Sequence, residues 1–296
     1  MRNVGQALQE AIESLELSRE EHERVTTRMQ EVQRALRTAF GPKTDFISGS
    51  YGRGTSIRPL KDIDFFVVLG DIVLTPSPAR PVRPSDALVE LRDGIHREIP
   101  RRTQPVIQRH SVRLESLETP IQFDVIPAYA CSNAPGYLIP ERKKDASEEQ
   151  WVRTDPRKHQ DACARANQRC GGRLNPLIKL VKHWKGHHAK GLKSFHLEVM
   201  CYGFQPPRPL RDPGYLEPLE ALFSHLSRAV MVGCPDPAEL GGDLDDYLGS
   251  SQRAAASQLL EHAAREVRLA REEQSSRPDS AHRRMRELFP GIYRGS

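Results

Sequence analysis

The sequence predicts an α+β fold with two lobes, one rich in strands and the other helical. Two observations carry this prediction. Short apolar runs rich in β-branched and aromatic residues occur between 45 and 129, as is typical of strands. From about 151 onward the apolar residues recur at helical spacing. A chain of 296 residues has room for both lobes. We place the sheet lobe, with its N-terminal helices, at 1–150 and the helical lobe at 151–296.

The first lobe begins with two predicted helices. Apolar residues at helical spacing predict a helix over 5–15. Ser18 and Glu21 predict a capping box for a second helix, which reaches about Phe40 and ends at Gly41-Pro42. A short strand at 45–47 follows, and a longer one begins at Asp62.

The remainder of the first lobe alternates between loops, a helix and strands. Four prolines predict a loop at 75–84, and Ser85 is expected to cap a helix to about Ile99. Strands are predicted near 105–115 and 120–129, with a turn at 116–119 between them. The charged run Glu141-Arg142-Lys143-Lys144 predicts a solvated loop.

The second lobe is expected to be almost wholly helical. Asn175-Pro176 predicts a helix start with Asn175 as the cap. Lys182 lies at the edge of the apolar stripe of this helix, whereas Lys179 is expected to face away. Ser194 begins another helix, and further helices are predicted near 216–230, 250–273 and 279–287.

Composition limits the classes of protein that the chain can belong to. No apolar run approaches the ~20 residues of a membrane span, and the N-terminus lacks the apolar core of a signal peptide. The five cysteines are odd in number and widely spaced, which favours a reducing cytoplasm over a disulfide framework. The net charge of +5 is a mild bias, as expected if basic residues line a cleft for polyanionic nucleotides.

Two carboxylates open the second strand. Asp62 and Asp64 precede an apolar run, and side chains at i and i+2 of a strand point to the same face. Such a pair repels unless a cation lies between the carboxylates, and a pair of divalent metals in phosphoryl or nucleotidyl transfer is the usual solution. Gly49-Ser50 upstream provides a backbone that phosphates can approach and a hydroxyl donor. We interpret the segment as a nucleotidyltransferase active site.

A third carboxylate supports this interpretation. In the predicted strand at 120–129, Asp124 lies on the face opposite Phe123 and Val125. An unpaired charge within such an apolar strand costs several kcal/mol, so we expect a metal or another cation beside Asp124. The alternative is an aspartate on an edge strand that pairs with an arginine.

Together these motifs resemble the polymerase-beta-type nucleotidyltransferase superfamily. Three short motifs resemble those of its bacterial cGAS/DncV-like branch: Gly49-Ser50-Tyr51, Arg53-Gly54-Thr55 and Asp62-Ile63-Asp64. The segment 175–185 with 192–198, and Leu288-Phe289-Pro290 near the end, are similar to further parts of that branch. The resemblance implies a polymerase-beta-like catalytic lobe with a mixed sheet and a cGAS-like helical lobe, the two arranged around a central cleft.

The resemblance also implies roles for individual residues. Asp62, Asp64 and Asp124 would hold two Mg²⁺ ions, for which Mn²⁺ can substitute, and act in catalysis. Gly49 and Ser50 would cradle the β- and γ-phosphates.

In relatives, a lysine and a serine of the helical lobe also contact the triphosphate, and an aromatic residue stacks on the donor base. The matching positions are Lys182, Ser194 and Phe195. The alternatives are a solvated lysine, a simple helix cap and an ordinary core residue. Arg53 either faces phosphate or is a surface arginine. The candidates His159, Cys163 and Cys170 lack a Cys-x-x-Cys pair, so no structural zinc is expected.

The function implied is the condensation of nucleoside triphosphates, ATP among them, into a cyclic di- or trinucleotide messenger with release of pyrophosphate, in anti-phage (CBASS) signalling. A phage-responsive regulatory partner is implied as well, while no membrane and no specific nucleic-acid ligand are expected. The alternatives are a linear-oligonucleotide or RNA-terminal nucleotidyltransferase, and a catalytically idle nucleotide sensor.

Overall fold

The computed structural model of the chain describes residues 3–72, 83–99, 103–116, 121–142, 148–206 and 214–295. The chain packs as two compact units, and each is described by itself. The sheet unit comprises Leu17–Gly54 and Leu60–Gln160; the helical unit comprises Met1–Glu16, Thr55–Pro59 and Asp161–Ser296. The domain boundary predicted near residue 150 stays a prediction. In the packing of the chain, the N-terminal helix and the five-residue segment at 55–59 belong to the same unit as the C-terminal helices.

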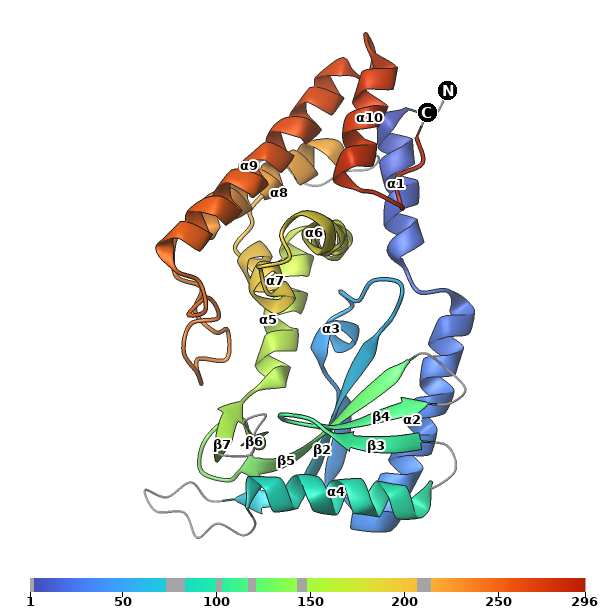
Figure 1. The fold of residues 1–296 in the computed structure, drawn as a ribbon, viewed down its shortest axis with the longest axis vertical. Coiled ribbons are helices and arrows are strands. Elements are labelled where there is room, and N and C mark those ends of the chain that lie inside the picture. Colours follow the sequence, from blue (N-terminus) through green and yellow to red (C-terminus); the bar gives the residue numbers. More distant parts are fainter. Residues whose placement is uncertain are drawn as a thin grey trace. The chain divides into compact units, whose positions relative to one another are not determined.

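The sheet unit contains one mixed sheet (Figure 1). Within the described residues its strands are β1 Thr44–Ile47, β2 Asp62–Ile72, β3 Thr103–Ile107, β4 Val112–Ser116, β5 Gln122–Cys131, β6 Tyr137–Arg142 and β7 Glu149–Thr154. Their order is β1-β2-β5-β4-β3, and the hairpin of β6 and β7 extends from the end of β5. β2 and β5 pair in parallel at the centre of the sheet, and the other pairs are antiparallel. The α+β prediction is confirmed.

Two helices, α2 Arg19–Phe40 and α4 Pro84–Glu98, cover one face of this sheet. Their apolar side chains form a common core with Phe65 of β2 and Phe123 of β5, both fully buried. The capping box of Ser18 and Glu21 is present, and α2 ends at Gly41 in the left-handed conformation, as predicted. Strand alternation explains the layering, because residues with the parity of Phe65 and Phe123 face the helices and their neighbours face the other side.

Some predicted boundaries in the sheet unit are wrong. The strand expected near 105–115 is two strands, β3 and β4, joined by a tight turn in which the Gln108 amide donates to the Ser111 carbonyl. Glu141 and Arg142 lie in β6 rather than in a loop, and Trp151 lies in β7 rather than in a helix. Apolar and charged residues stand in blocks along the β6–β7 hairpin, with Tyr137-Leu138-Ile139 ahead of Glu141-Arg142, so its strands lack an alternating apolar signal. They form because β5 and each other provide hydrogen-bond partners.

At α4 the cap is also misplaced: Arg83 is the N-cap and Pro84 occupies the first turn, ahead of the predicted cap Ser85. Most of the proline-rich loop predicted at 75–84, most of the turn predicted at 116–119, and the predicted loop residues Lys143 and Lys144 lie outside the described residues.

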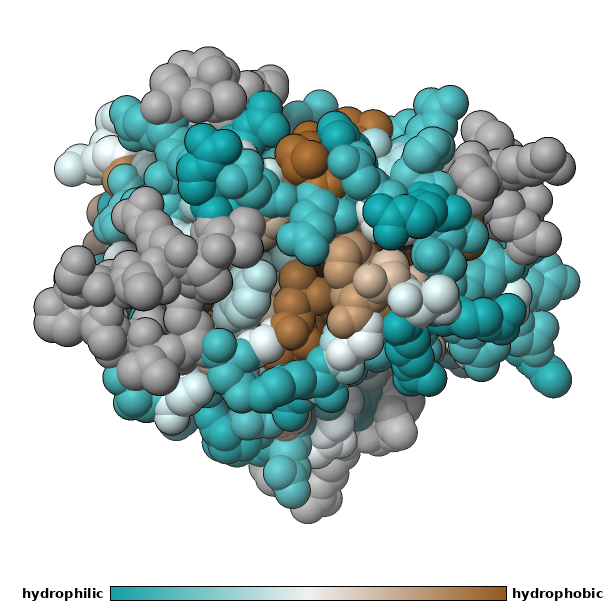
Figure 2. Space-filling view, turned by 90° about the horizontal axis from the view of Figure 1, so that it is seen from below, coloured by the Kyte–Doolittle hydropathy of each residue, from teal (hydrophilic) through white to brown (hydrophobic). Residues whose placement is uncertain are grey.

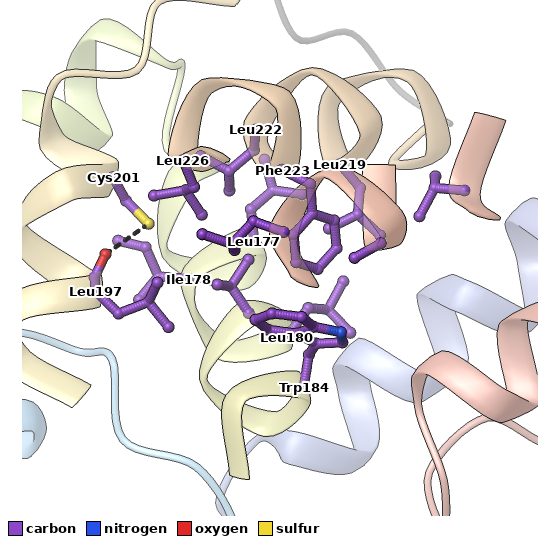
Figure 3. Close-up of a cluster of buried hydrophobic side chains, with 14 of the residues drawn as sticks. Leu177, Ile178, Leu180, Trp184, Leu197, Cys201, Leu219, Leu222, Phe223 and Leu226 are labelled. Carbon is purple, nitrogen blue, oxygen red and sulfur yellow. Dashed lines mark hydrogen bonds between the residues drawn. The ribbon is translucent and has the colours of Figure 1, made fainter. Parts of the chain in front are cut away.

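The helical unit is built around α6 Leu174–His188. Its other elements are α1 Val4–Leu15, α5 Pro156–Arg169 (which begins in the sheet unit), α7 Ser194–Tyr202, α8 Leu216–Ala229, α9 Ser250–Glu273 and α10 Pro278–Leu288. Figure 3 shows α6 presenting Leu177, Leu180 and Trp184 to Phe223 of α8, with the two aromatic rings 5.1 Å apart and edge to face. The helices predicted near 216–230, 250–273 and 279–287 are confirmed.

The start of α6 differs from the prediction. Asn175 is not its cap; the side-chain oxygen of Asn167, in α5, accepts the backbone N–H groups of Leu174 and Asn175 at 3.0 and 3.1 Å. A residue from the preceding helix therefore satisfies donors that a local cap would otherwise satisfy. Lys179 is buried and forms an ion pair with Glu16, instead of facing away. Its ammonium has found a partner that is distant in sequence.

None of the helices in the described part of the chain has the length and apolar character that a bilayer crossing requires. The molecular face in Figure 2 is mostly hydrophilic, with apolar residues gathered near its middle. The five cysteines are all free.

Candidate active site

The structure brings the three predicted carboxylates to neighbouring positions on the sheet. Asp64 of β2 and Asp124 of β5 are register partners in the parallel pair at the centre of the sheet. Asp62 lies two residues before Asp64, so it points to the same face. Ile63 and Phe65, with the opposite parity, are buried against the helices. Alternation along two adjacent strands therefore gathers the carboxylates on the face that α2 and α4 leave open.

The charge of Asp64 is disfavoured by this environment. Burial, followed by the negative charges of Asp62 and Asp124, raises the pKa of Asp64 to about 6, and the positive charges of Arg53 and Arg113 oppose the rise. Clustered carboxylates with a raised pKa are characteristic of functional sites. Arg53 thus contributes a positive charge to this site.

Arg113 is a residue that the sequence interpretation missed. It is the β4 partner of Asp124, and its guanidinium donates two hydrogen bonds to the carboxylate, at 2.9 and 3.0 Å. Asp124 in turn raises the pKa of Arg113 above its ordinary value. The aspartate–arginine alternative is therefore present, but on an interior strand beside two other carboxylates. Strand parity is a signal that could have found Arg113, because it lies between the buried Val112 and Leu114.

The Gly49-Ser50 turn lies directly against Asp64. The Ser48 amide donates to the Asp64 carbonyl at 2.8 Å, which joins the turn to β2. Gly49 begins the single helical turn α3 Gly49–Gly52 and has a φ of +62°. A Cβ atom at Gly49 would lie 1.8 Å from Oδ2 of Asp64. Only glycine fits here, for reasons of both conformation and space.

These residues fit a divalent metal by the chemistry of their donors. Carboxylate oxygens are hard ligands of the kind that Mg²⁺ prefers. Burial, and after it the neighbouring negative charges, raises the pKa of Asp64 and so disfavours its ionised form, a penalty that a cation would relieve. Both oxygens of Asp124 are engaged by Arg113, so a metal ligated by Asp124 would compete with that guanidinium. A group that could hold one metal ion needs one ligand oxygen from each residue, with all of these oxygens within 4.8 Å of one another, and Asp62, Asp64 and Asp124 do not meet this spacing.

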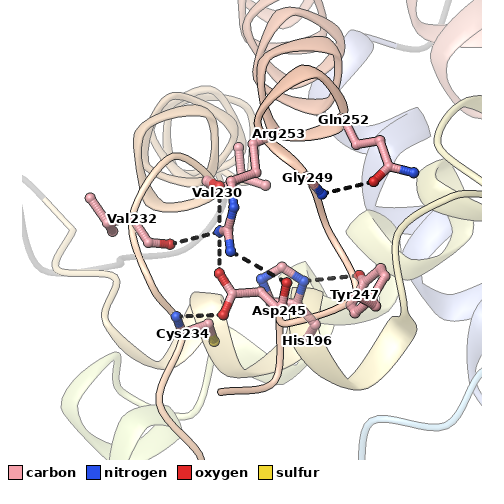
Figure 4. A network of polar contacts seen from close by, with 9 residues as sticks. All are labelled: His196, Val230, Val232, Cys234, Asp245, Tyr247, Gly249, Gln252 and Arg253. Carbon is pink, nitrogen blue, oxygen red and sulfur yellow. Dashed lines mark hydrogen bonds and ion pairs between the residues drawn. The ribbon is translucent and has the colours of Figure 1, made fainter. Parts of the chain in front are cut away.

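Within the described residues, the group that meets this spacing is Asp243, Asp245 and Asp246 in the helical unit. Asp245 already has partners (Figure 4): its fully buried carboxylate pairs with Arg253 and accepts the Cys234 amide at 3.0 Å. Tyr247 beside it accepts the Lys193 amide at 2.7 Å. These contacts give Asp245 and Tyr247 a structural role in the loop between α8 and α9.

The other predicted nucleotide contacts belong to the helical unit. Lys182 donates to the Thr55 carbonyl at 2.8 Å and lies 3.5 Å from the Glu198 carboxylate. Ser194 is the first residue of α7 and accepts a hydrogen bond from Lys185 at 3.3 Å. Phe195 is half-buried against the helical core. Lys185, which is partly exposed on the last turn of α6, was not predicted as a nucleotide contact and is added by the structure.

Residues 2–167, more than half of the chain, match the Second Messenger Oligonucleotide or Dinucleotide Synthetase (SMODS) domain. A probable cyclic nucleotide synthase of Bacillus cereus (strain VD146) is 28% identical over 228 residues, which are 67% of this chain and 67% of that protein. The cyclic AMP-AMP-AMP synthase of Acinetobacter sp. is 29% identical over 168 residues, 52% of this chain but 44% of its own length.

Among solved structures, Vibrio cholerae DncV cyclic AMP-GMP synthase, in complex with its linear intermediate 5′ pppA(3′,5′)pG, has a similar fold. The TM-score is 0.78 at 14% identity, covering 99% of this chain and 97% of that one.

Proposed function

We propose, from the premise that this chain belongs to the SMODS family of bacterial cGAS/DncV-like nucleotidyltransferases, that it condenses nucleoside triphosphates into a cyclic di- or trinucleotide with release of pyrophosphate. The observation that carries the proposal is the arrangement of Asp62, Asp64 and Asp124 on one face of the sheet, against the glycine-serine turn. Two similar proteins are named cyclic nucleotide synthases, which supports a cyclic product.

In this proposal the three carboxylates hold two Mg²⁺ ions, or Mn²⁺ in their place. The ions would stabilise the charge that develops on the attacking and leaving oxygens. Asp124 accepts the proton of the attacking ribose hydroxyl. Gly49, without a side chain, lets the β- and γ-phosphates approach the backbone, and the Ser50 hydroxyl donates to them. The residues thereby orient an in-line attack on the α-phosphate.

The helical unit carries the residues that the family resemblance assigns to the donor nucleotide. Ser194 contacts the triphosphate together with a lysine of α6. Lys182 is the candidate from family resemblance, and Lys185 is the one that touches Ser194. Phe195, which is half-buried, stacks on the donor base.

We further propose that ATP is among the substrates and that the product signals in anti-phage defence in the cytoplasm. Escherichia coli MS115-1 CdnC, 17% identical with a TM-score of 0.75, has been solved in complex with a HORMA protein. By analogy, a regulatory partner would control this chain as well.

The test incubates the protein with all four nucleoside triphosphates and Mg²⁺ and analyses the products by mass spectrometry. We expect a phosphatase-resistant cyclic product that is lost in Asp62→Ala and in Asp64→Ala. Asp71→Ala is the matched control, because Asp71 lies on the same strand in an exposed ion pair with Lys43. A product that persists in the first two variants would remove the assignment.

The same assay separates the alternatives. A linear-oligonucleotide or RNA-terminal transferase would yield phosphatase-sensitive products or extend a labelled RNA. A catalytically idle sensor would bind a nucleotide analogue in a metal-dependent way without turnover.

A further inference from the structure

The Gly49-Ser50 turn, to which the proposed function assigns phosphate binding, is a short element. It is the single helical turn α3, which begins and ends with a glycine. Glycine loses more conformational freedom on ordering than any other residue, and one isolated helical turn is not stable by itself. Contacts from outside the turn therefore have to fix it. One of them is the bond from the Ser48 amide to the Asp64 carbonyl of β2.

The first turn of α5 packs against β1, the strand that leads into the Gly49-Ser50 turn. This part of α5 belongs to the sheet unit, whose last residue is Gln160. Its start is fixed by the buried Asp155, whose carboxylate accepts the backbone N–H groups of Arg157 and Lys158 at 3.2 and 3.1 Å. The Arg157 guanidinium lies 4.6 Å from the centroid of the Phe46 ring in β1. Residues at i and i+3 of a helix share a face, so Gln160 is directed at the same strand.

Gln160 contacts the residue at the entrance of the turn. Its side-chain Nε2 donates to the Ile47 carbonyl at 2.7 Å. Ile47 is the last residue of β1 and directly precedes Ser48, the N-cap of α3. The bond is partly buried, and the lower local dielectric strengthens it relative to an exposed one.

The same amide lies against the exit of the turn. A Cβ atom at Gly52 would be 2.5 Å from Nε2 of Gln160 and 2.9 Å from the Ile47 carbonyl oxygen. Gly52 does not have a positive φ, so space rather than backbone conformation calls for glycine at this position. The absence of a side chain at Gly52 is therefore what lets Gln160 reach Ile47.

We propose that Gln160 is a positioning residue that holds the Gly49-Ser50 turn at both ends, through the Ile47 carbonyl and the bare backbone of Gly52. It acts on the nucleotide through the turn and does not touch it. This inference rests on the proposed function, in which the turn binds the β- and γ-phosphates. A loosened turn is competent to bind for only a fraction of the time, and the apparent affinity falls by that fraction. The phosphate contacts persist into the transition state, so loss of Gln160 raises KM and leaves kcat nearly unchanged.

The first test needs neither nucleotide nor activity. Hydrogen exchange of the amides at 49–54 is measured on Gln160→Met, which keeps the length of the side chain but has no donor. Gln168→Met is the matched control, because Gln168 lies on the same helix and is exposed. We expect exchange about threefold to tenfold faster in Gln160→Met, the range that loss of one hydrogen bond allows, and the wild-type rate in Gln168→Met. Unchanged exchange at 49–54 in Gln160→Met would overturn the proposal.

Gly52→Ala disturbs the same contact from the other side. The added methyl group would displace the Gln160 amide, so this variant is also expected to speed exchange at 49–54. In Gln160→Ala the obstructing nitrogen is gone, and adding Gly52→Ala should then have a smaller effect than it has in the wild type. Strictly additive effects would show that Gly52 and Gln160 act separately and would contradict the bridging role. If Gln160→Met does not fold, as judged by circular dichroism, Gly52→Ala decides the test alone.

The second test separates positioning of the turn from a role in the chemical step. Steady-state kinetics of pyrophosphate release from ATP are compared for Gln160→Met and Gln168→Met. We expect KM to rise at least about threefold in Gln160→Met with kcat within about twofold of wild type, and neither to change in Gln168→Met. A lower kcat at unchanged KM would assign Gln160 to the chemical step and overturn the proposal. A raised KM without faster exchange at 49–54 would mean that Gln160 touches the nucleotide, which also overturns it.

The outcomes distinguish the two proposals. A wild-type protein that forms no nucleotide product refutes the proposed function, and hydrogen exchange then decides whether Gln160 holds the turn. An active wild type whose exchange and KM are unaltered in Gln160→Met refutes the positioning role alone.

Discussion

At the scale of single residues, the carboxyl of Asp64 lies where its charge is penalised. Its pKa of about 6 in the folded protein exceeds the ordinary value of 3.8. An acid with a raised pKa binds its proton more tightly in the folded state, so its ionisation reduces stability as the pH rises from about 4 to 6. A shift of about two units corresponds to about 3 kcal/mol above that window.

We therefore predict that Asp64→Asn stabilises the metal-free protein. The gain should reach up to about 3 kcal/mol at pH 7.5, shrink between pH 6 and pH 4, and vanish below about pH 4, where the wild-type carboxyl is also neutral. Urea denaturation in EDTA at these pH values measures it. Asp71→Asn, on the same strand, should show no comparable gain. A gain that is equal at every pH would contradict the electrostatic explanation.

Gly49 is the second residue whose neighbourhood allows a sharp prediction. In Gly49→Ala the new methyl group would collide with Oδ2 of Asp64, so we expect Asp64 to be displaced. Product formation should fall at least about 100-fold, because a displacement of about 1 Å in a reacting group can cost that much in rate. Gly171→Ala is a matched control: its φ of +61° nearly equals the +62° of Gly49, but nothing lies within 4 Å of the added Cβ.

Both variants bear the strain of a side chain in the left-handed region, about 1–2 kcal/mol. Steady-state activity and melting temperature are measured together. Equal losses of activity in Gly49→Ala and Gly171→Ala would show that strain alone, rather than the contact with Asp64, is responsible.

At the scale of elements, the pairing of β4 with β5 sets the charge balance of the site. Because Arg113 and Asp124 are cross-strand partners, the sheet register itself delivers a cation to the third carboxylate. A divalent metal at Asp124 would replace part of that interaction. The pairing of β4 with β5 thus gives the Asp124 carboxylate a partner from the protein itself, Arg113, as an alternative to a metal ion.

From this we predict that Arg113→Met destabilises the protein in EDTA by about 1–3 kcal/mol, the penalty for leaving the largely buried Asp124 carboxylate without its partner. Added Mg²⁺ should raise the melting temperature of the variant more than that of wild type. Arg109→Met, which removes a more exposed arginine paired with Glu141, should not change the response to Mg²⁺. Equal shifts in all three proteins would argue against metal binding at Asp124.

At the scale of the whole molecule, the proposed reaction depends on divalent metal ions, and the protein ligands proposed for them are all carboxylates: Asp62, Asp64 and Asp124. We predict that EDTA abolishes product formation and that excess Mg²⁺ or Mn²⁺ restores it, because oxygen ligands suit both ions. The same titration in Asp62→Ala should require more metal or fail altogether. Undiminished turnover in EDTA would exclude the two-metal proposal.

The sequence by itself determined the features that depend on neighbours a few residues apart. The capping box at Ser18, the end of α2 at Gly41, and the shared face of Asp62 and Asp64 all follow from local periodicity and backbone geometry. The side of the strand on which Asp124 lies was readable in the same way. The alternation of buried and accessible residues repeats every two positions, however the strand is later paired.

Only the tertiary structure decided which distant groups meet. Arg113 reaches Asp124 through the register of β4 and β5, and Asn167 replaces the expected cap at Asn175. Lys182 finds a carbonyl 127 residues away at Thr55. No local pattern encodes these contacts, because a buried polar group takes whichever partner the packing brings within reach. The β6–β7 hairpin escaped prediction for the same reason, because its residues do not alternate and its pairing with β5 places it in the sheet.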